Sequence, residues 1–222
     1  MTAAASRLLP LVFGVLMAVA AAYRADGSAV FADDNDPLGM SAMFRSFVAG
    51  QLATLRELTL FYAPNINSYK RFVDGSFAPT AIAWGLDNRT CALRVVGHGA
   101  GMRMECRAPG GDVNQYLATA ALIAGGLHGI EQGLELPDAT DGNAYTSGAD
   151  RLPTTMSEAA ELLDKSEIAR AAFGDDVVDH YLKAGKIAAP PSTAADADAM
   201  YQNMFQRRRV SNMITVRCFR LR

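Results

Sequence analysis

The chain has 222 residues, of which 50% are hydrophobic, and its 21 basic and 23 acidic side chains give a formal net charge of -2. These values fit one globular domain with short appendages. Because the charges nearly cancel, no general field attracts phosphate backbones, and we expect neither a nucleic-acid nor a membrane partner. Any anion-binding site must therefore be local.

An apolar, uncharged run opens the chain at residues 8–22. It follows Arg7 and ends in three alanines, which is typical of a signal peptide with a small-residue cleavage site. The run is short for a membrane span. Two interpretations stay open, a secretion signal and a non-native leader joined to a globular domain, so residues 1–22 are set apart as an apolar leader.

The sequence pattern of residues 23–187 predicts an α+β domain. Strands are predicted at 80–84, 91–96 and 102–108. Apolar residues at helical spacing predict a helix after the N-cap Ser41 and a long buried helix at 113–134. A Thr155–Glu158 capping pattern begins a helical region whose last two helices end before Gly174 and Gly185.

The C-terminal residues 188–222 differ in composition from the rest of the chain. A Pro190-Pro191-Ser192-Thr193 segment predicts a linker, and the arginine-rich tail after it is predicted to be disordered and solvated. The three cysteines, Cys91, Cys106 and Cys218, lack the spacing of a metal site or a disulfide framework. We expect them to be reduced packing residues.

The most informative short stretch is the strand at Arg103-Met104-Glu105-Cys106-Arg107. Strand alternation places two guanidinium groups and one carboxylate on the same face, with the sulfur-containing side chains on the other. Arginine suits phosphate and carboxylate oxygens, and a carboxylate held between such groups stays ionised and can bind Mg²⁺. A surface ladder of Arg/Glu pairs, worth about 0.2–1 kcal/mol each, is the alternative.

Several motifs around this strand follow one another in a fixed order. They are Asn67-Ser68-Tyr69-Lys70-Arg71, Ala78-Pro79, Asn88-Arg89, Arg94, the Arg103–Arg107 strand, and Asn114 with Tyr116-Leu117 at a helix start. This order resembles the glutamine synthetase family. The resemblance implies that the chain is the C-terminal part of the catalytic domain, an incomplete antiparallel sheet flanked by helices.

The resemblance also implies a reaction and a role for each site residue. Glutamate is phosphorylated by ATP on its γ-carboxyl group, and an amine then displaces the phosphate, an activity of nitrogen metabolism. By this resemblance Arg71 and Arg107 hold the carboxylates of glutamate, Arg89, Arg94 and Arg103 meet the nucleotide phosphates, Arg89 also acts as the catalytic arginine, and Glu105 binds the metal, Mg²⁺ or Mn²⁺.

Two departures from the family pattern change what is expected. Ammonia-using members carry a glutamate before the Ala-Pro pair, whereas this chain has Phe77. An aromatic wall in place of an anion favours a larger, partly apolar amine. The chain therefore resembles most the γ-glutamyl-polyamine and γ-glutamyl-monoamine synthetase branch.

The second departure concerns the region before Tyr23, where the family has an N-terminal β-grasp domain and several metal-binding glutamates. Glu105 alone cannot supply the roughly six oxygens that Mg²⁺ prefers. We expect a truncated, cytoplasmic chain that is inactive alone, from a family whose full-length members form homo-oligomeric rings. A non-catalytic remnant that binds anions or associates with a full-length relative is the alternative, and a secreted binding module is a third.

Overall fold

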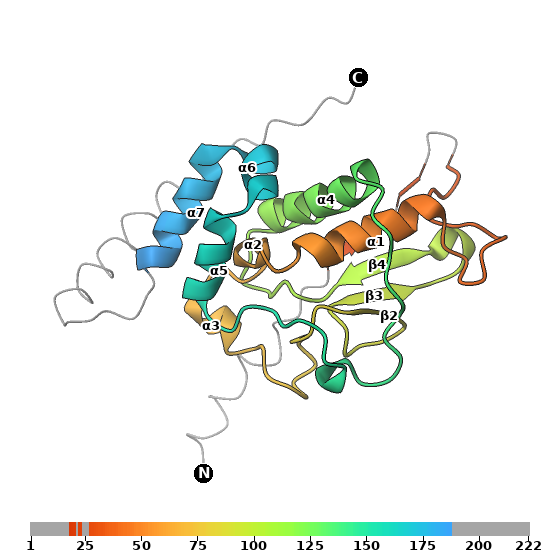
Figure 1. Cartoon of the computed structure of the whole chain (residues 1–222), viewed down its shortest axis with the longest axis horizontal. Coiled ribbons are helices and arrows are strands. Elements are labelled where there is room, and N and C mark those ends of the chain that lie inside the picture. Colours follow the sequence, from red (N-terminus) through yellow and green to blue (C-terminus); the bar gives the residue numbers. More distant parts are fainter. Residues whose placement is uncertain (1–17, 21, 24–26, 188–222) are drawn as a thin grey trace, which may run out of the picture.

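The computed structural model describes residues 18–20, 22–23 and 27–187, and the side chains of 18–20 and 185–187 are outside this description. A four-stranded sheet forms one layer, and helices cover it (Figure 1). In the spatial order β1-β4-β3-β2, the strands are β1 (Ala18–Ala20), β4 (Arg103–Cys106), β3 (Leu93–Val96) and β2 (Trp84–Leu86). The predicted α+β class is confirmed.

The sheet is mixed, which corrects the expectation of an antiparallel sheet. β4 pairs antiparallel with both β1 and β3, but β2 runs parallel to β3, with Trp84 opposite Leu93. β2 also begins later than the strand predicted at 80–84. The segment before it pairs instead with a loop from the C-terminal part, through Ile82 N–H to Asp150 O (2.7 Å) and Leu152 N–H to Thr80 O (2.9 Å).

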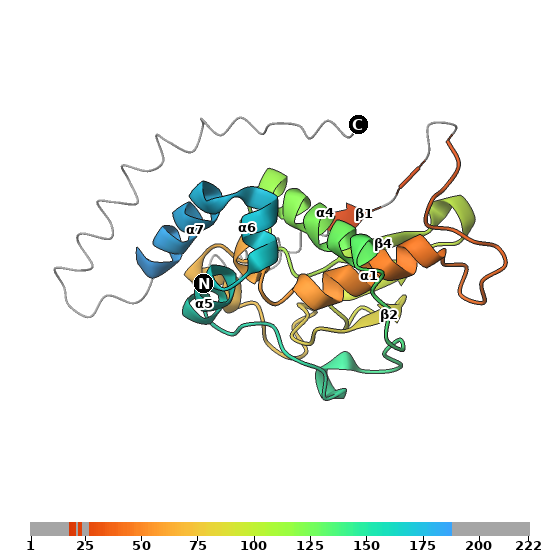
Figure 2. The same ribbon diagram turned by 45° about the horizontal axis from the view of Figure 1, so that its top comes forward.

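Two helices, α1 (Ala42–Thr54) and α4 (Gln115–Glu131), pack against each other and lie over the sheet (Figure 2). The predicted N-cap is confirmed, since the Ser41 hydroxyl accepts a hydrogen bond from Phe44 N–H. Glycines allow the two helices to approach closely: a Cβ on Gly50 would lie 2.2 Å from the carbonyl oxygen of Gly125. This pair of helices covers one face of the sheet (Figures 1 and 2).

Short and peripheral helices complete the described part. They are α2 (Thr59–Tyr62), α3 (Ile66–Tyr69), α5 (Met156–Asp164), α6 (Glu167–Phe173) and α7 (Asp175–Ile187), with 3₁₀ turns η3 (Gly99–Gly101) and η4 (Ala144–Thr146). Thr155 caps α5 as predicted, by accepting from Glu158 N–H. Gly174, with φ of 77°, ends α6, but α7 continues past Gly185, so that predicted stop is wrong. Among the described helices, none has the length and apolar character needed to cross a membrane.

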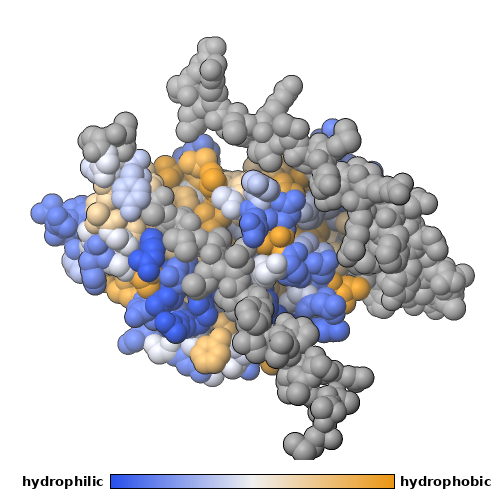
Figure 3. Space-filling model, turned by 180° about the vertical axis from the view of Figure 1, so that it is seen from behind, coloured by the Kyte–Doolittle hydropathy of each residue, from blue (hydrophilic) through white to orange (hydrophobic). Residues whose placement is uncertain are grey.

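The core lies between the sheet and the α1–α4 pair. Phe31 stacks on Phe44 with ring centroids 4.4 Å apart, and the fully buried Met104 of β4 belongs to the same cluster. Cys91 and Cys106 are buried and reduced, as predicted. Seen from behind, the surface mixes hydrophilic and hydrophobic areas (Figure 3).

The predicted leader at residues 1–22 and the predicted tail at residues 188–222 can be compared with the described residues. β1 lies within residues 1–22, the segment predicted as an apolar leader, and it is part of the sheet. Residues 1–17, Cys218 and the predicted disordered tail at 188–222 lie outside the described residues. The boundaries predicted at 22 and 187 therefore stay predictions.

Candidate active site

β4 presents its charged side chains on one face of the sheet. Met104 and Cys106 are fully buried on the core side, and strand alternation turns Arg103 and Glu105 the other way. The antiparallel register places Arg94 of β3 directly opposite Glu105. Arg94 Nη1 lies 2.7 Å from Glu105 Oε2, so a cross-strand Arg/Glu pair of the kind that the sequence left open as the alternative is present.

Arg94 has a second carboxylate partner, Asp87, which follows β2. Its Nε donates to Asp87 Oδ1 at 2.9 Å, and its Nη2 also contacts that oxygen. Burial alone lowers the pKa of Arg94, but the two carboxylates outweigh this effect and raise it. The guanidinium is thus held between two anions, where the sequence had predicted a ligand of nucleotide phosphates.

Arg103 and Arg89 are the more accessible arginines of this face. The side chain of Arg103 is 41% exposed and lies 3.8 Å from Glu105, a longer contact than that of Arg94. Arg89 is exposed in the turn after β2, and its charge acts on both Asp87 and Arg107. These two guanidinium groups are therefore placed to meet an incoming anion.

Arg107 is buried at the end of β4, with 5% of its surface exposed. Burial and the neighbouring Arg94 lower its pKa, although Glu105 acts in the opposite direction. Its Nη2 donates to the carbonyl oxygen of Phe77 at 2.9 Å. The predicted glutamate-binding arginine is thus joined directly to the predicted wall of the amine site.

Phe77 lies on an exposed loop in an unusual conformation. Its φ is 62°, a left-handed value that is rare for an aromatic residue, and 69% of its surface is exposed. The next residue is fixed from the other side, since the Tyr145 hydroxyl donates to Ala78 O at 3.1 Å. Hydrogen bonds to the backbone therefore hold this loop, and the ring of Phe77 is exposed.

Arg71 approaches the same end of β4 from the loop after α3. Its Nη2 donates to Ala108 O, and its guanidinium carbon lies 5.2 Å from the centre of the Phe72 ring. Burial lowers its pKa. Its Nη1 is buried and has no hydrogen-bond partner among the described residues.

Asp112 supports this loop, a role that the sequence did not reveal. Its Oδ2 accepts from Ser68 Oγ at 2.6 Å and from Asn65 Nδ2 at 3.1 Å. The neighbouring Gly110 has no room for a side chain, because a Cβ there would lie 2.5 Å from Asp112 Oδ1 and 3.3 Å from Arg71 Nη2. In the sequence, the position of Gly110 and Asp112 shortly before the N-cap Asn114 was the signal that could have indicated their role.

The described residues do not form a metal site by themselves. Within residues 18–20, 22–23 and 27–187, no group of three or more His, Cys, Asp or Glu side chains is arranged to hold a metal ion. Glu105 is the one predicted ligand, and it is 4% exposed and ion-paired. One carboxylate supplies too few oxygens for Mg²⁺.

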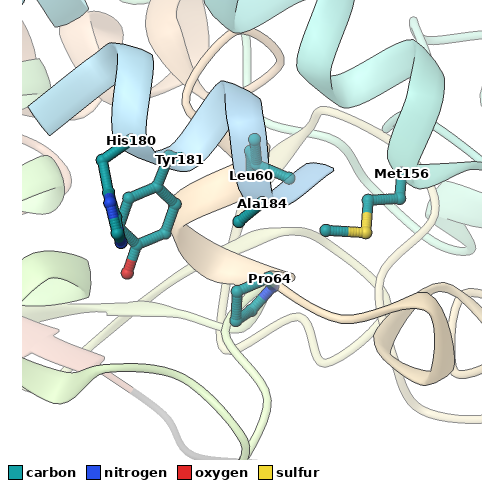
Figure 4. A pocket seen from close by; sticks show the side chains of 6 residues that line it. All are labelled: Leu60, Pro64, Met156, His180, Tyr181 and Ala184. Carbon is teal, nitrogen blue, oxygen red and sulfur yellow. The ribbon is translucent and has the colours of Figure 1, made fainter. Parts of the chain in front are cut away.

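A separate hollow of about 190 Å³ lies between α2, α5 and α7 (Figure 4). It is lined by Leu60, Pro64, Met156, His180, Tyr181 and Ala184. None of the arginines described above lines it, and its lining is mostly apolar. It is therefore distinct from the charged face of the sheet.

The family model of the glutamine synthetase catalytic domain matches residues 13–189. The chain belongs to this family. The match begins inside the segment predicted as a leader, in agreement with the place of β1 in the sheet. The family assignment predicted from the motifs is confirmed.

Several curated relatives of this glutamine synthetase family are similar to the chain. A γ-glutamylethanolamide synthetase, GlnA4, of Streptomyces coelicolor is 57% identical over 82% of the chain and 39% of its own length. Type-1 glutamine synthetase 2 of Dictyostelium discoideum is 48% identical over 71% of the chain and 31% of its own length. A glutamate–isopropylamine ligase of a Pseudomonas species is 42% identical over 70% of the chain and 35% of its own length.

Solved structures agree with this assignment. Ligand-free GmaS superposes with a TM-score of 0.69 at 27% identity, over 87% of this chain and 44% of that one. A GmaS complex with ADP gives the same TM-score. The chain therefore spans less than half the length of the relatives and structures described here.

Proposed function

We propose that this chain forms the arginine-bearing part of the active site of an ATP-dependent ligase that joins the γ-carboxyl group of glutamate to an amine. The observation that carries the proposal is the single cationic face on which Arg94, Arg103 and Arg107 surround Glu105. Arg89 and Arg71 approach its edges. Membership of the glutamine synthetase family supports this assignment.

The proposed reaction has two steps. The γ-phosphoryl group of ATP passes to a γ-carboxylate oxygen of glutamate, which gives γ-glutamyl phosphate and ADP. The amine nitrogen then attacks the acyl carbon, phosphate leaves, and the nitrogen loses a proton to form the amide. Phosphoryl transfer depends mainly on positioning and charge neutralisation.

The accessible guanidinium groups of Arg89 and Arg103 would neutralise the phosphoryl oxygens. Arg71 and Arg107 would hold the carboxylates of glutamate, and the unpartnered Nη1 of Arg71 supports this role. Donors already fixed by a buried environment need little rearrangement as charge develops on the substrate.

Enzymes of the glutamine synthetase family use ATP and divalent metals. We propose Mg²⁺ or Mn²⁺ here, with Glu105 as one ligand. The other carboxylates must come from residues beyond those that the structure describes, in this chain or in a partner. We also propose a cytoplasmic location, where ATP and glutamate are available, and a ring-like homo-oligomer as the active assembly.

Phe77 supports a larger amine than ammonia. Its exposed ring stands beside the carbonyl that Arg107 holds, where it offers apolar contact and no negative charge. Two of the relatives are named for ethanolamine and isopropylamine products or substrates. We propose a small alkylamine or a polyamine as the nucleophile.

A second candidate function is anion binding without catalysis. It is favoured by Glu105, whose carboxylate is buried against Arg94 and so already neutralised in the described part. In that case the cationic face would bind nucleotides or associate with a full-length relative, and no amide would form.

Equilibrium binding of ATP to the purified chain tests the cationic face. Arg103→Gln removes an accessible guanidinium and should weaken ATP binding by about tenfold or more, since a hydrogen bond to a charged group contributes roughly 1.5–3 kcal/mol. Arg56→Gln is the matched control, because Arg56 is an exposed arginine paired with Glu158 and far from β4 in sequence. Equal affinities for the two variants would contradict the proposal.

Product analysis then separates the two candidates. The chain is incubated with glutamate, ATP, Mg²⁺ and either ethanolamine or ammonia, and γ-glutamyl amides are measured by mass spectrometry. We expect ATP binding without amide from the chain alone, because Glu105 cannot hold the metals. In any active assembly that contains the chain, faster reaction with ammonia than with ethanolamine would contradict the amine assignment.

A further inference from the structure

The two carboxylates that hold Arg94 differ sharply in their exposure. The side chain of Glu105 is 5% exposed, and that of Arg94 is 13% exposed, whereas the side chain of Asp87 is 76% exposed. The Glu105 contact is therefore shielded from solvent on the face of the sheet. The Asp87 contact faces solvent.

The two contacts also use different parts of the guanidinium. Glu105 accepts a hydrogen bond from Nη1, whereas Asp87 accepts one from Nε and also contacts Nη2. The Nε–Nη2 edge is one of the planar forks of arginine that bind two oxygens of a carboxylate or a phosphate. Asp87 thus covers the part of Arg94 that suits a phosphate group.

The turn that carries Asp87 is fixed. Asn88 donates through Nδ2 to Thr140 O at 3.1 Å and to Gly142 O at 2.8 Å, and it accepts from Thr90 N–H at 3.0 Å. Asp87 itself has φ of 47°, and its N–H donates to Val95 O at 2.9 Å. The backbone therefore keeps Asp87 beside Arg94, while 76% of its side chain is exposed to solvent.

We propose that Asp87 is an internal anion that occupies the outer edge of Arg94 until a polyphosphate displaces it, so that Asp87 sets the affinity of this face for the phosphates of a nucleotide. The inference rests on the proposed function, because it assumes that the arginine face binds polyphosphate. After displacement, the phosphate would meet Arg94 together with the accessible Arg89 and Arg103.

Charge supports this competition. The hydrogen bond from Arg94, and then the charge of that arginine, lower the pKa of Asp87, so its carboxyl group is ionised at neutral pH. An ionised Asp87 acts against a polyanion in two ways, by occupying donors and by direct repulsion. A residue with a purely structural role would do neither, and its loss would not strengthen binding.

The test compares tripolyphosphate binding to the whole chain and to Asp87→Asn by isothermal titration calorimetry at low salt. Asparagine tolerates the left-handed backbone at this position, so the turn is retained. Asp176→Asn is the matched control, since it makes the same charge change on α7, at the opposite end of the molecule from β2 (Figures 1 and 2). Thermal unfolding confirms that both variants are folded.

We expect Asp87→Asn to bind tripolyphosphate about three- to tenfold more tightly than the unmodified chain, the scale of one exposed ion pair and one added repulsion. The gain should shrink as salt screens the charges, and Asp176→Asn should show none. Equal or weaker binding by Asp87→Asn, or an equal gain in the control, would overturn the inference alone. No binding by any of the three proteins would overturn the proposed function as well.

Discussion

The close contact between α1 and α4 predicts a large effect of a single methyl group. In Gly129→Ala, the new Cβ would lie 2.1 Å from Ser46 O and 2.6 Å from Gly50 Cα. Both neighbours are backbone atoms, which cannot turn aside as a flexible side chain can. Reaching a 3.0 Å separation requires the helices to move apart by at least about 0.9 Å.

A gap of this size removes roughly a quarter to a half of the dispersion energy of the atom pairs that it separates. Overpacking of this kind costs about 1–3 kcal/mol, and the backbone clash favours the upper end. The higher helix propensity of alanine relative to glycine offsets up to about 1 kcal/mol of this loss in the free energy of unfolding. We therefore expect the free energy of unfolding to fall by about 2 kcal/mol, and Tm by about 4–8 °C.

Urea unfolding followed by the fluorescence of Trp84 measures this effect, because Trp84 is the only tryptophan of the chain and is 2% exposed. Gly101→Ala is the control: a Cβ there has no neighbour within 4 Å. The control should be neutral or stabilising by up to about 1 kcal/mol. If Gly129→Ala were as stable as the unmodified chain, the tight helix contact would be refuted.

The remaining predictions concern pH and backbone strain. Burial raises the pKa of Cys91 to about 11 and that of Cys106 to about 12. Both thiols have a higher pKa in the folded state than in the unfolded state, so their contribution to the free energy of unfolding is complete below pH 9 and is lost as the pH rises towards 11–12. The urea midpoint should therefore fall over that pH range. A constant midpoint would contradict this prediction. At Phe77, glycine should be more stable than alanine by about 1 kcal/mol, because only glycine relieves the left-handed φ. Equal urea midpoints for Phe77→Gly and Phe77→Ala would show that this position is unstrained.

Local patterns in the sequence predicted much of the site. Strand alternation correctly separated Glu105 from Met104 and Cys106, because side-chain direction in a strand follows from spacing alone. The cap at Ser41 and the helix that follows it were predicted for the same reason, since capping is a local hydrogen bond.

Contacts between distant segments could not be predicted in this way. The segment before β2 has the composition of a strand, but its partner is the loop at 150–152, about seventy residues away. The parallel pairing of β2 with β3 brings Asp87 close to Arg94, whereas the turn pattern showed only a change of direction. Gly185 gave a stop signal, but α7 continues to Ile187.

β1 gives the sheet its outer strand beside β4, with Val19 opposite Glu105. Proteolytic cleavage after Ala22 would remove this strand and leave the outer N–H and C=O groups of β4 open to solvent. Open strand edges are templates for pairing with other chains and favour aggregation. The edge of β4 therefore stays paired only while the three residues of β1 remain joined to the rest of the sheet.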